Sequence, residues 1–323
     1  MARKSWMYSV LEAAQNEMRQ DKNMVWIFEL TPPVASTPGK PVINLEREFG
    51  RNRVVNTGID ENWMASATLG AGLAGSKAVT YIPYQGNCMC FQVIQNHAGK
   101  LRSMSGGKAS MPVVFILEMT GQTPGFAGQH SDYEIDTYYA HIPGVKTVVP
   151  STPYDAKGMM VSAIRDPNPV VYLYPAGLRE LMEEVPDEQY TVPLDKAAVR
   201  TTGSDITIVG HGASMPDVLE ATAKLQKQGM KVEAIDLRCL KPMDTETLVK
   251  SVQKTKFLLT VDQGYYTLSP GAEVVARCAE NVVGARFKRV AFPDAPPPAS
   301  PEMFMWMRPN ADHVVQAAMK LVG

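Results

Sequence analysis

The chain has 323 residues, of which 45% are hydrophobic and 20% charged, and its formal net charge is −1. This length predicts about two domains, each long enough to form a core of its own. Near-neutral charge without a Lys/Arg-rich run argues against nucleic acid as the main partner, and no stretch approaches the ~20 apolar residues of a membrane span.

The N-terminus and the cysteines favour a cytoplasmic protein. Residues 1–6 lead into a mixed polar segment instead of an apolar one, so the sequence predicts no signal peptide. Four cysteines lack the paired spacing of a metal site and are expected to be buried, reduced thiols. They are Cys88, Cys90, Cys239 and Cys278.

Helix and strand patterns alternate through the first half of the chain. A helix is predicted over 6–20 and a buried strand over 24–28, and the breaker-rich stretch 31–41 is not expected to form regular structure. The further predicted strands are 53–56, 78–82, 113–117, 147–149 and 170–174, and the further helices are 63–74, 90–102, 132–140 and 154–164. Such alternation predicts a parallel sheet covered by helices on both faces.

The same alternation restarts after a polar stretch. Strands are predicted at 206–209, 232–237, 257–261 and 287–290, and helices at 215–228, 245–255 and 272–279. We therefore predict an α/β fold with two domains, each a mainly parallel sheet flanked by helices. The first covers 1–185, a linker covers 186–200, and the second covers 201–323. Neither domain carries GxGxxG after a strand, so no dinucleotide site is predicted.

Glu61 and His130 are the main candidates for catalysis. Glu61 lies between the strand at 53–56 and a helix rich in small residues, and His130 lies between the strand at 113–117 and the next helix. The chain has no GxxxxGK[ST], no Gly-Asp-Gly followed by a metal-ligating Asn, and no Cys/His cluster. We interpret the pair as half of an active site whose other half belongs to a different polypeptide.

Short segments along most of the chain match one family in order. They include 53–62 (RVVNTGIDEN), 105–107, 128–131 (GQHS), 141–146, 150–158, 162–169 (SAIRDPNP), 235–238 and 271–273. Each is weak alone, but together the chain resembles the β subunits of thiamine-diphosphate-dependent 2-oxo acid dehydrogenase E1 components, within the wider transketolase group.

The resemblance implies a pyrimidine-binding domain followed by a C-terminal domain. It also implies that thiamine diphosphate is the cofactor and that a partner α subunit carries the Gly-Asp-Gly site for the diphosphate and Mg²⁺. The expected assembly is α2β2, with active sites between α and β. Docking to a lipoyl acyltransferase is left open, because 262–264 reads Asp-Gln-Gly where relatives usually have Asp-Glu-Gly.

The resemblance also assigns roles to site residues. Glu61 matches the glutamate that contacts N1′ of the aminopyrimidine ring and favours its imino tautomer. His130 matches the histidine that faces the reacting carbon. Tyr84 and Gln85 fall in the segment that usually places an aromatic over the aminopyrimidine. The alternatives are a carboxylate favoured by a helix N-terminus for Glu61 and a hydrogen-bonded loop histidine for His130.

In some relatives a matching loop binds potassium through main-chain and side-chain oxygens. The corresponding residues here are Val113, Ala163, Ile164, Asp166 and Asn168. The same Asp-Pro-Asn-Pro sequence would form an ordinary helix-ending turn without any ion, so both interpretations stay open.

Two departures from the family bear on the substrate. A Gly-Glu-Asp-Val-Gly-like stretch is replaced by Phe28-Glu29-Leu30 and the proline-rich segment, so part of the cofactor pocket should be rebuilt. Where relatives often have Arg-x-Pro-x-Gly, residues 116–121 read ILEMTG. Losing a cation and gaining Glu118 would disfavour an anionic 2-oxo acid and favour a neutral ketone, diketone or acyloin. Alternatively, Glu118 pairs with an arginine of the partner subunit and the substrate is a common 2-oxo acid.

The predicted function is cleavage of a carbon–carbon bond next to a carbonyl, with transfer of the acyl or aldehyde unit to an acceptor. One alternative is the C-terminal subunit of a split transketolase. Another is a paralogue that only scaffolds an α partner, although a scaffold has no chemical need for Glu61 and His130.

Overall fold

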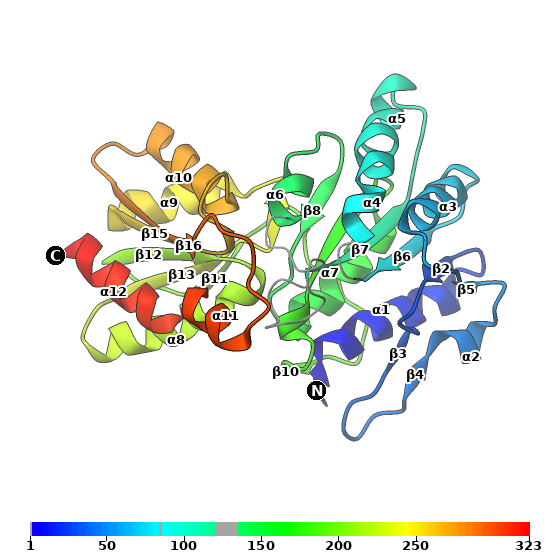
Figure 1. The fold of residues 1–323 in the computed structure, drawn as a ribbon, viewed down its shortest axis with the longest axis horizontal. Helices are drawn as coiled ribbons and strands as arrows, with labels where there is room; N and C mark the ends of the chain where they lie inside the picture. Colours follow the sequence, from blue (N-terminus) through cyan, green and yellow to red (C-terminus); the bar gives the residue numbers. More distant parts are fainter. Residues whose placement is uncertain (1, 84–85, 120–134) are drawn as a thin grey trace. The chain divides into compact units, whose positions relative to one another are not determined.

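The computed structural model describes residues 2–83, 86–119 and 135–323 (Figure 1). The described residues divide into two compact units, one built from 2–83, 86–119 and 141–194 and the other from 135–140 and 195–323. The chain thus passes between units inside the predicted linker, after Leu194. Residues 135–140 group with the second unit, although the sequence prediction placed them in the first domain.

The first unit contains a parallel sheet with the strand order β8-β9-β7-β6-β2-β5. Every residue of β6, β7 and β9 is buried, as expected for apolar strands covered on both faces. The strands are β2 (Val25–Phe28), β5 (Val54–Asn56), β6 (Ala78–Ile82), β7 (Val113–Met119), β8 (Lys146–Val148) and β9 (Val170–Pro175).

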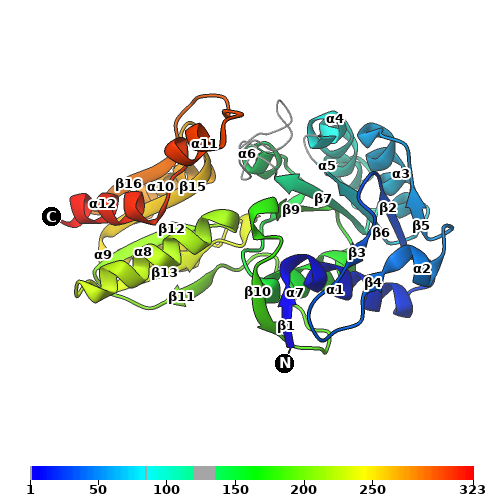
Figure 2. The same ribbon diagram turned by 60° about the horizontal axis from the view of Figure 1, so that its bottom comes forward.

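Helices cover this sheet, and α1 packs along α7 while α3 packs against β6 and α4 (Figure 2). The small-residue helix α3 packs closely at Gly72, where an added Cβ would lie 2.5 Å from Cγ1 of Val113. The predicted helix 90–102 is interrupted by a π-helical segment, Val93–Ala98. The helices are α1 (Trp6–Gln20), α2 (Leu45–Phe49), α3 (Glu61–Leu73), α4 (Gly86–Gln92), α5 (Gly99–Met104) and α7 (Pro153–Arg165).

The prediction that 31–41 has no regular structure is wrong at one point. Strand β3 (Val34–Ala35) pairs antiparallel with β4 (Ile43–Asn44). The prolines of this segment lie outside the two paired stretches, so none of them removes a donor from the ladder. A second short pair joins β1 (Ala2–Ser5) to β10 (Met182–Val185), also antiparallel.

The second unit has a five-stranded sheet in the order β11-β13-β12-β15-β16. All neighbours are parallel except β11, which is antiparallel to β13 and occupies part of the predicted linker. The strands of this unit are β11 (Ala198–Thr201), β12 (Ile206–Gly210), β13 (Val232–Asp236), β14 (Cys239–Lys241), β15 (Phe257–Tyr265) and β16 (Arg286–Phe292).

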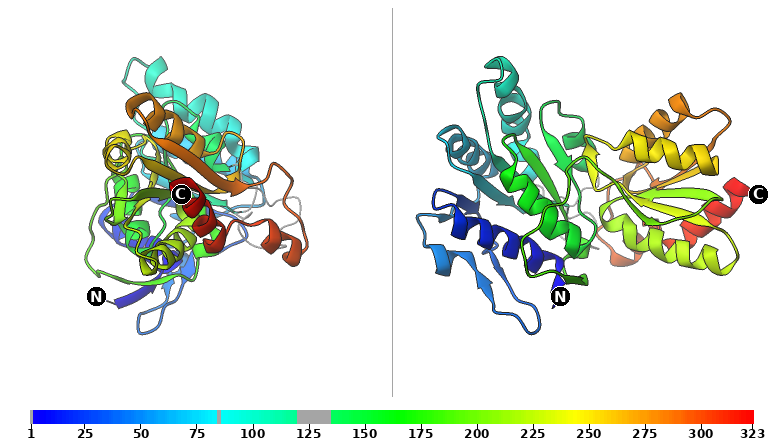
Figure 3. Two further views of the ribbon diagram at one scale, coloured as in Figure 1. Left: turned by 90° about the vertical axis from the view of Figure 1, so that its left-hand side faces the viewer. Right: turned by 180° about the vertical axis from the view of Figure 1, so that it is seen from behind.

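In this unit α8 packs against α12, and α9 packs against α10 (Figure 3). The helices are α6 (Ile135–Ala140), α8 (Met215–Lys227), α9 (Thr245–Thr255), α10 (Pro270–Asn281), α11 (Pro301–Met307) and α12 (Ala311–Val322). The sequence prediction did not include α11 or α12. The predicted α/β class with two mainly parallel sheets is confirmed. Within the described residues, no helix is long and apolar enough to cross a membrane.

Candidate active site

Glu61 is the first residue of α3, and the strands β2 and β5 end close to it in the fold. Asp60 caps the helix, since its Oδ1 accepts a hydrogen bond from the Trp63 amide at 2.9 Å. The carboxylate of Glu61 is partly exposed and makes no hydrogen bond or ion pair with the described residues. A helix N-terminus favours a carboxylate, but no donor among residues 2–83, 86–119 and 135–323 uses this one. Within that part of the chain it is available to a ligand.

Glu29 follows β2, the neighbouring strand of the parallel sheet, and its side chain is buried with 1% exposure. Its Oε2 accepts a hydrogen bond from the Asp60 amide at 3.2 Å. Burial and the negative charge of Glu61 raise the pKa of Glu29 to about 7, although the bond from Asp60 acts in the opposite direction. Leu30, the next residue, has a φ of 50°, a left-handed conformation that is uncommon for leucine.

Glu29 and Glu61 therefore form a pair of carboxyl groups with different environments. Burial and the charge of Glu61 raise the pKa of the buried one to about 7, and the other is partly exposed at the start of α3. Such a pair suits a ligand with a protonatable ring nitrogen, since one carboxyl can share a proton with it. Sequence reasoning treated Glu29 only as a departure from the family. The sequence signal that could have identified Glu29 is its position directly after a buried strand, which places a carboxylate at the carboxyl edge of a parallel sheet.

Three predicted site residues, Tyr84, Gln85 and His130, lie outside the described residues. Their roles stay predictions.

Glu118 has partners within its own chain. Its side chain is 6% exposed, and its Oε2 accepts a hydrogen bond from the hydroxyl of Tyr81 at 2.6 Å. Burial and the charge of Glu118 raise the pKa of Tyr81 well above its usual range, so the phenol stays a donor. Burial alone would lower the pKa of Arg179. Its neighbours, which include Tyr174 and Glu118, raise this pKa overall. Glu118 therefore has a hydrogen-bond donor within its own chain.

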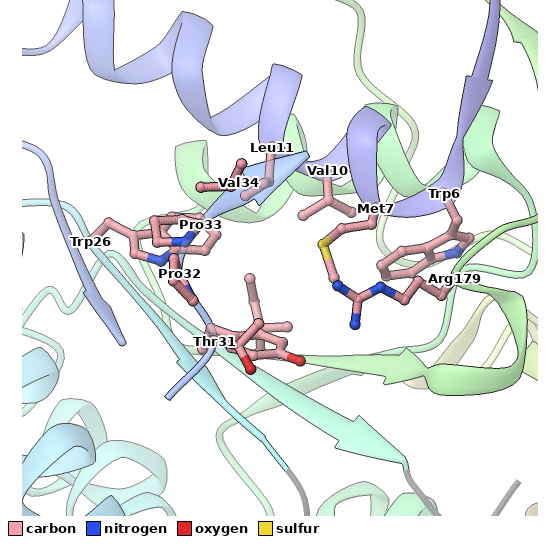
Figure 4. Close-up of a pocket in the computed structure, with 12 residues that line it drawn as sticks. Trp6, Met7, Val10, Leu11, Trp26, Thr31, Pro32, Pro33, Val34 and Arg179 are labelled. Atoms are coloured by element: carbon pink, nitrogen blue, oxygen red, sulfur yellow. The ribbon is translucent and has the colours of Figure 1, made fainter. Parts of the chain in front are cut away.

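A pocket lies between α1 and the proline-rich segment of the first unit (Figure 4). Trp26 and Arg179 stand at opposite ends of it, and Thr31 lies between them. The indole Nε1 of Trp26 is buried and has no hydrogen-bond partner within the described ranges. Most of the wall is apolar, and it includes Pro32 and Pro33. The segment that replaces the usual family stretch therefore forms the wall of an apolar pocket that begins two residues after Glu29.

Two of the five predicted potassium ligands, Ala163 and Asp166, use oxygens in contacts within the protein. Oδ1 of Asp166 accepts hydrogen bonds from the backbone and side-chain nitrogens of Asn168, at 2.9 and 3.2 Å. Its other oxygen is paired with the Lys146 ammonium. The carbonyl of Ala163 accepts from the Asp166 amide at 3.3 Å. These contacts form the ordinary helix-ending turn. They do not present a set of free oxygens, so the potassium site stays a prediction.

Among the remaining histidines, only His211 has a buried environment. His97 and His141 are exposed. Nε2 of His211 lies 2.9 Å from Oδ2 of Asp136, and its Nδ1 lies 3.9 Å from Oδ1 of Asp262. Sequence reasoning had found no partner for this histidine.

The prediction for the cysteines is confirmed for three of the four thiols. Cys90, Cys239 and Cys278 are buried, whereas Cys88, in α4, is exposed. None of the four forms a disulfide.

Two family comparisons cover nearly the whole chain. Residues 3–180 match the transketolase pyrimidine-binding domain, and residues 195–314 match the transketolase C-terminal domain. The two matches correspond to the two sheets described above.

Full-length relatives carry two different names. The pyruvate dehydrogenase E1 component subunit beta of Bacillus subtilis is 34% identical over 331 residues, which cover 100% of this chain and 99% of the relative. The acetoin:2,6-dichlorophenolindophenol oxidoreductase subunit beta of Cupriavidus necator is 34% identical over 336 residues, which cover 99% of this chain and 98% of the relative.

A solved structure of a split-gene transketolase, described as an inactive beta4 tetramer, is similar in fold. It aligns with a TM-score of 0.80 and 20% identity over 98% of both chains. The two domain matches and the full-length relatives together show that the chain belongs to the transketolase-like family, as a β-type subunit of an E1 enzyme component.

Proposed function

We propose that this chain is the β subunit of a heteromeric thiamine-diphosphate enzyme that cleaves a carbon–carbon bond next to a carbonyl. The acyl or aldehyde unit then passes to an acceptor, such as a lipoyl group. The observation that carries the proposal is the carboxyl pair of Glu29 and Glu61 at the carboxyl edge of the pyrimidine-domain sheet.

The carboxyl pair fits an aminopyrimidine ring. Glu61, which has no partner among the described residues, would hold a proton at N1′ of the ring. Glu29 would keep its own proton up to a pH near 7, and so would limit repulsion between the two groups. When bound, the cofactor supplies the electron sink for bond cleavage, and the protein supplies orientation and proton control.

The remaining assignments come from the family. His130 would lie near the reacting carbon and move protons there. Tyr84 and Gln85 would lie against the aminopyrimidine. Mg²⁺ and the diphosphate would be held by an α subunit with a Gly-Asp-Gly motif, in an α2β2 assembly.

Glu118 was expected to disfavour an anionic substrate, but it is buried, it accepts a hydrogen bond from Tyr81, and the positive charge of Arg179 acts on it. The two relatives named above share the same identity with this chain, so identity does not separate their activities. We therefore propose a small carbonyl substrate of either class, a 2-oxo acid or an acyloin-type ketone.

Steady-state kinetics on the α–β assembly test this function. We would compare pyruvate, branched 2-oxo acids and acetoin, with a dye as electron acceptor and a sugar phosphate as the control. Turnover of either carbonyl class supports the proposal and identifies the substrate. Turnover of the sugar phosphate alone would instead assign the chain to a split transketolase.

A further inference from the structure

A second groove lies in the C-terminal unit and is lined by residues of β16, α11 and α12. Its volume is about 350 Å³. It has no part in the carboxyl pair described above. Its lining is Tyr266, Lys288, Arg289, Val290, Ala291, Trp306, Met307, Pro309, His313, Gln316, Ala317 and Lys320.

The groove is cationic. Lys288, Arg289 and Lys320 line it, and its lining includes no acidic side chain among the described residues. Neither lysine forms an ion pair within the part of the chain that the structure describes. The nearest acidic residues along the chain are used elsewhere. Asp312 pairs with Lys224 at 2.8 Å, and Asp294 accepts from the Thr267 hydroxyl at 2.6 Å.

The arginine of the groove is held in place. Its guanidinium carbon lies 3.8 Å from the centre of the Tyr266 ring, and its Nη1 donates to the Tyr266 carbonyl at 2.8 Å. A guanidinium that is already positioned by stacking loses less freedom when it binds a carboxylate. The groove therefore combines one oriented cation with two flexible ones.

An apolar surface continues from the groove along α11. Trp306 is 82% exposed, and its neighbours Met303 and Met305 are 56% and 53% exposed. Exposed Trp and Met beside Arg are typical of protein–protein contacts. A small anion would fill only the cationic part and would leave this apolar surface in water, so the combination favours a peptide over a nucleotide or phosphate.

We propose that this groove binds an acidic segment of a partner protein. Carboxylates of that segment pair with Lys288, Arg289 and Lys320, and an apolar side chain of the segment packs on Trp306. The cationic lining rejects basic segments, so charge determines which partner binds.

Fluorescence anisotropy with the full-length chain tests the proposal. The probes are a labelled peptide of alternating glutamate and leucine and its counterpart with lysine in place of glutamate. The acidic peptide should bind, more weakly at higher salt, and the basic peptide should not. Binding of both peptides, or of neither, would overturn the proposal.

Charge reversal locates the site. The double variant Lys288→Glu/Lys320→Glu should weaken binding of the acidic peptide about tenfold or more. The matched control Lys227→Glu/Lys250→Glu reverses two exposed lysines on α8 and α9 and should leave affinity unchanged. Equal affinity in both double variants would show that the peptide binds elsewhere.

Two further measurements separate a peptide site from a simple anion site. Trp306→Ala should weaken the acidic peptide, and an exposed tryptophan can be removed without loss of the core. ADP and inorganic phosphate should not displace the peptide at equal concentration. Displacement by either, with affinity unchanged in Trp306→Ala, would assign the groove to small anions and contradict the proposal.

Discussion

Two groups of buried carboxylates, one in each unit, have opposite surroundings. In the second unit, Asp136 and Asp262 surround the ring of His211, and Asp262 also accepts from Ser269 and from the Gly271 amide, both at 3.0 Å. In the first unit, buried Glu29 has another carboxylate, Glu61, as its charged neighbour. We call the His211 group, in which opposite charges are paired, the closed cluster. We call Glu29 and Glu61, which carry like charges, the open pair.

This difference distinguishes carboxylates with a structural role from carboxylates that form a candidate functional site. A buried charge that is paired and hydrogen-bonded can hold elements together. A buried carboxyl beside a like charge costs stability in the free protein, so its presence points to a ligand that relieves the cost. The open pair is therefore the candidate site, and His211 belongs to the framework of its unit.

The largest effect is expected for Glu61→Gln, which removes the free carboxylate of the open pair. Turnover of the assembled enzyme should fall by roughly 10²–10⁴-fold, because the ring nitrogen loses its acid. Thermal stability should not fall, since Glu61 has no partner among the described residues. The exposed Glu184→Gln serves as the matched control and should keep full activity. Full activity in Glu61→Gln would favour the scaffold alternative.

Removing a charged group from the closed cluster should lower the folding stability instead of the activity. Asp136→Asn removes the charged partner of His211 and should cost about 3 kcal/mol of unfolding free energy. Chemical denaturation measures this, with exposed Asp195→Asn as control. An unchanged midpoint for Asp136→Asn would show that the pair contributes nothing.

The closed cluster also predicts a pH dependence. Burial lowers the pKa of His211, but the hydrogen bond and charge of Asp136, with Asp262 and Asp236, raise it overall. The stabilisation is therefore fully present below the ordinary pKa of histidine and is lost as pH rises through the raised folded-state pKa. Chemical denaturation across this pH window should show that the unfolding free energy of the wild type decreases with rising pH. The decrease should be smaller in Asp136→Asn.

The open pair, Glu29 and Glu61, should lower the folding stability of the free protein. Folded Glu29 keeps its proton until pH about 7, whereas the unfolded residue releases it near its model value of 4.5. The native state thus binds more protons between these values, and stability falls as pH rises through the window. Glu29→Gln should remove this loss and stabilise the free chain at pH 8 by about 2–3 kcal/mol. A destabilised Glu29→Gln would mean that the ionised carboxylate is needed for folding.

The smallest effect is expected at Glu118. Tyr81→Phe removes the hydroxyl that donates to this buried carboxylate and should cost about 1–3 kcal/mol. The preference between pyruvate and acetoin should change little, because the positive charge of Arg179 still acts on Glu118. Tyr266→Phe, on the other unit, is the control for loss of a hydroxyl. A large change of preference in Tyr81→Phe would restore Glu118 as a substrate-selecting residue.

The sequence predicted regular elements well where local pattern determines them. The helix expected at 6–20 matches α1, whose N-terminus is capped by the Ser5 side chain. The strand at 78–82 and the helix at 245–255 also match. The β3–β4 pair was missed because its prolines suggested only a loop, and α11 lies in a proline- and methionine-rich region. The apolar period of α12, at Ala311, Val314, Ala318 and Leu321, was readable from the sequence and was overlooked.

The candidate site was predicted less completely. Glu61 was found through its flanking motif, whereas Glu29 is a single carboxylate with no motif of its own. Its importance depends on β2 and β5 being neighbours, which no local pattern reveals. The His211–Asp136 contact joins residues 75 positions apart, and only the three-dimensional structure could show it.

Co-purification from the native host, followed by mass spectrometry and a thiamine-diphosphate assay, tests the central claim most directly. The account predicts a co-eluting chain with a Gly-Asp-Gly motif and bound thiamine diphosphate in the complex. A complex of this chain alone, without a partner or cofactor, would contradict the split-site proposal and the role given to Glu61.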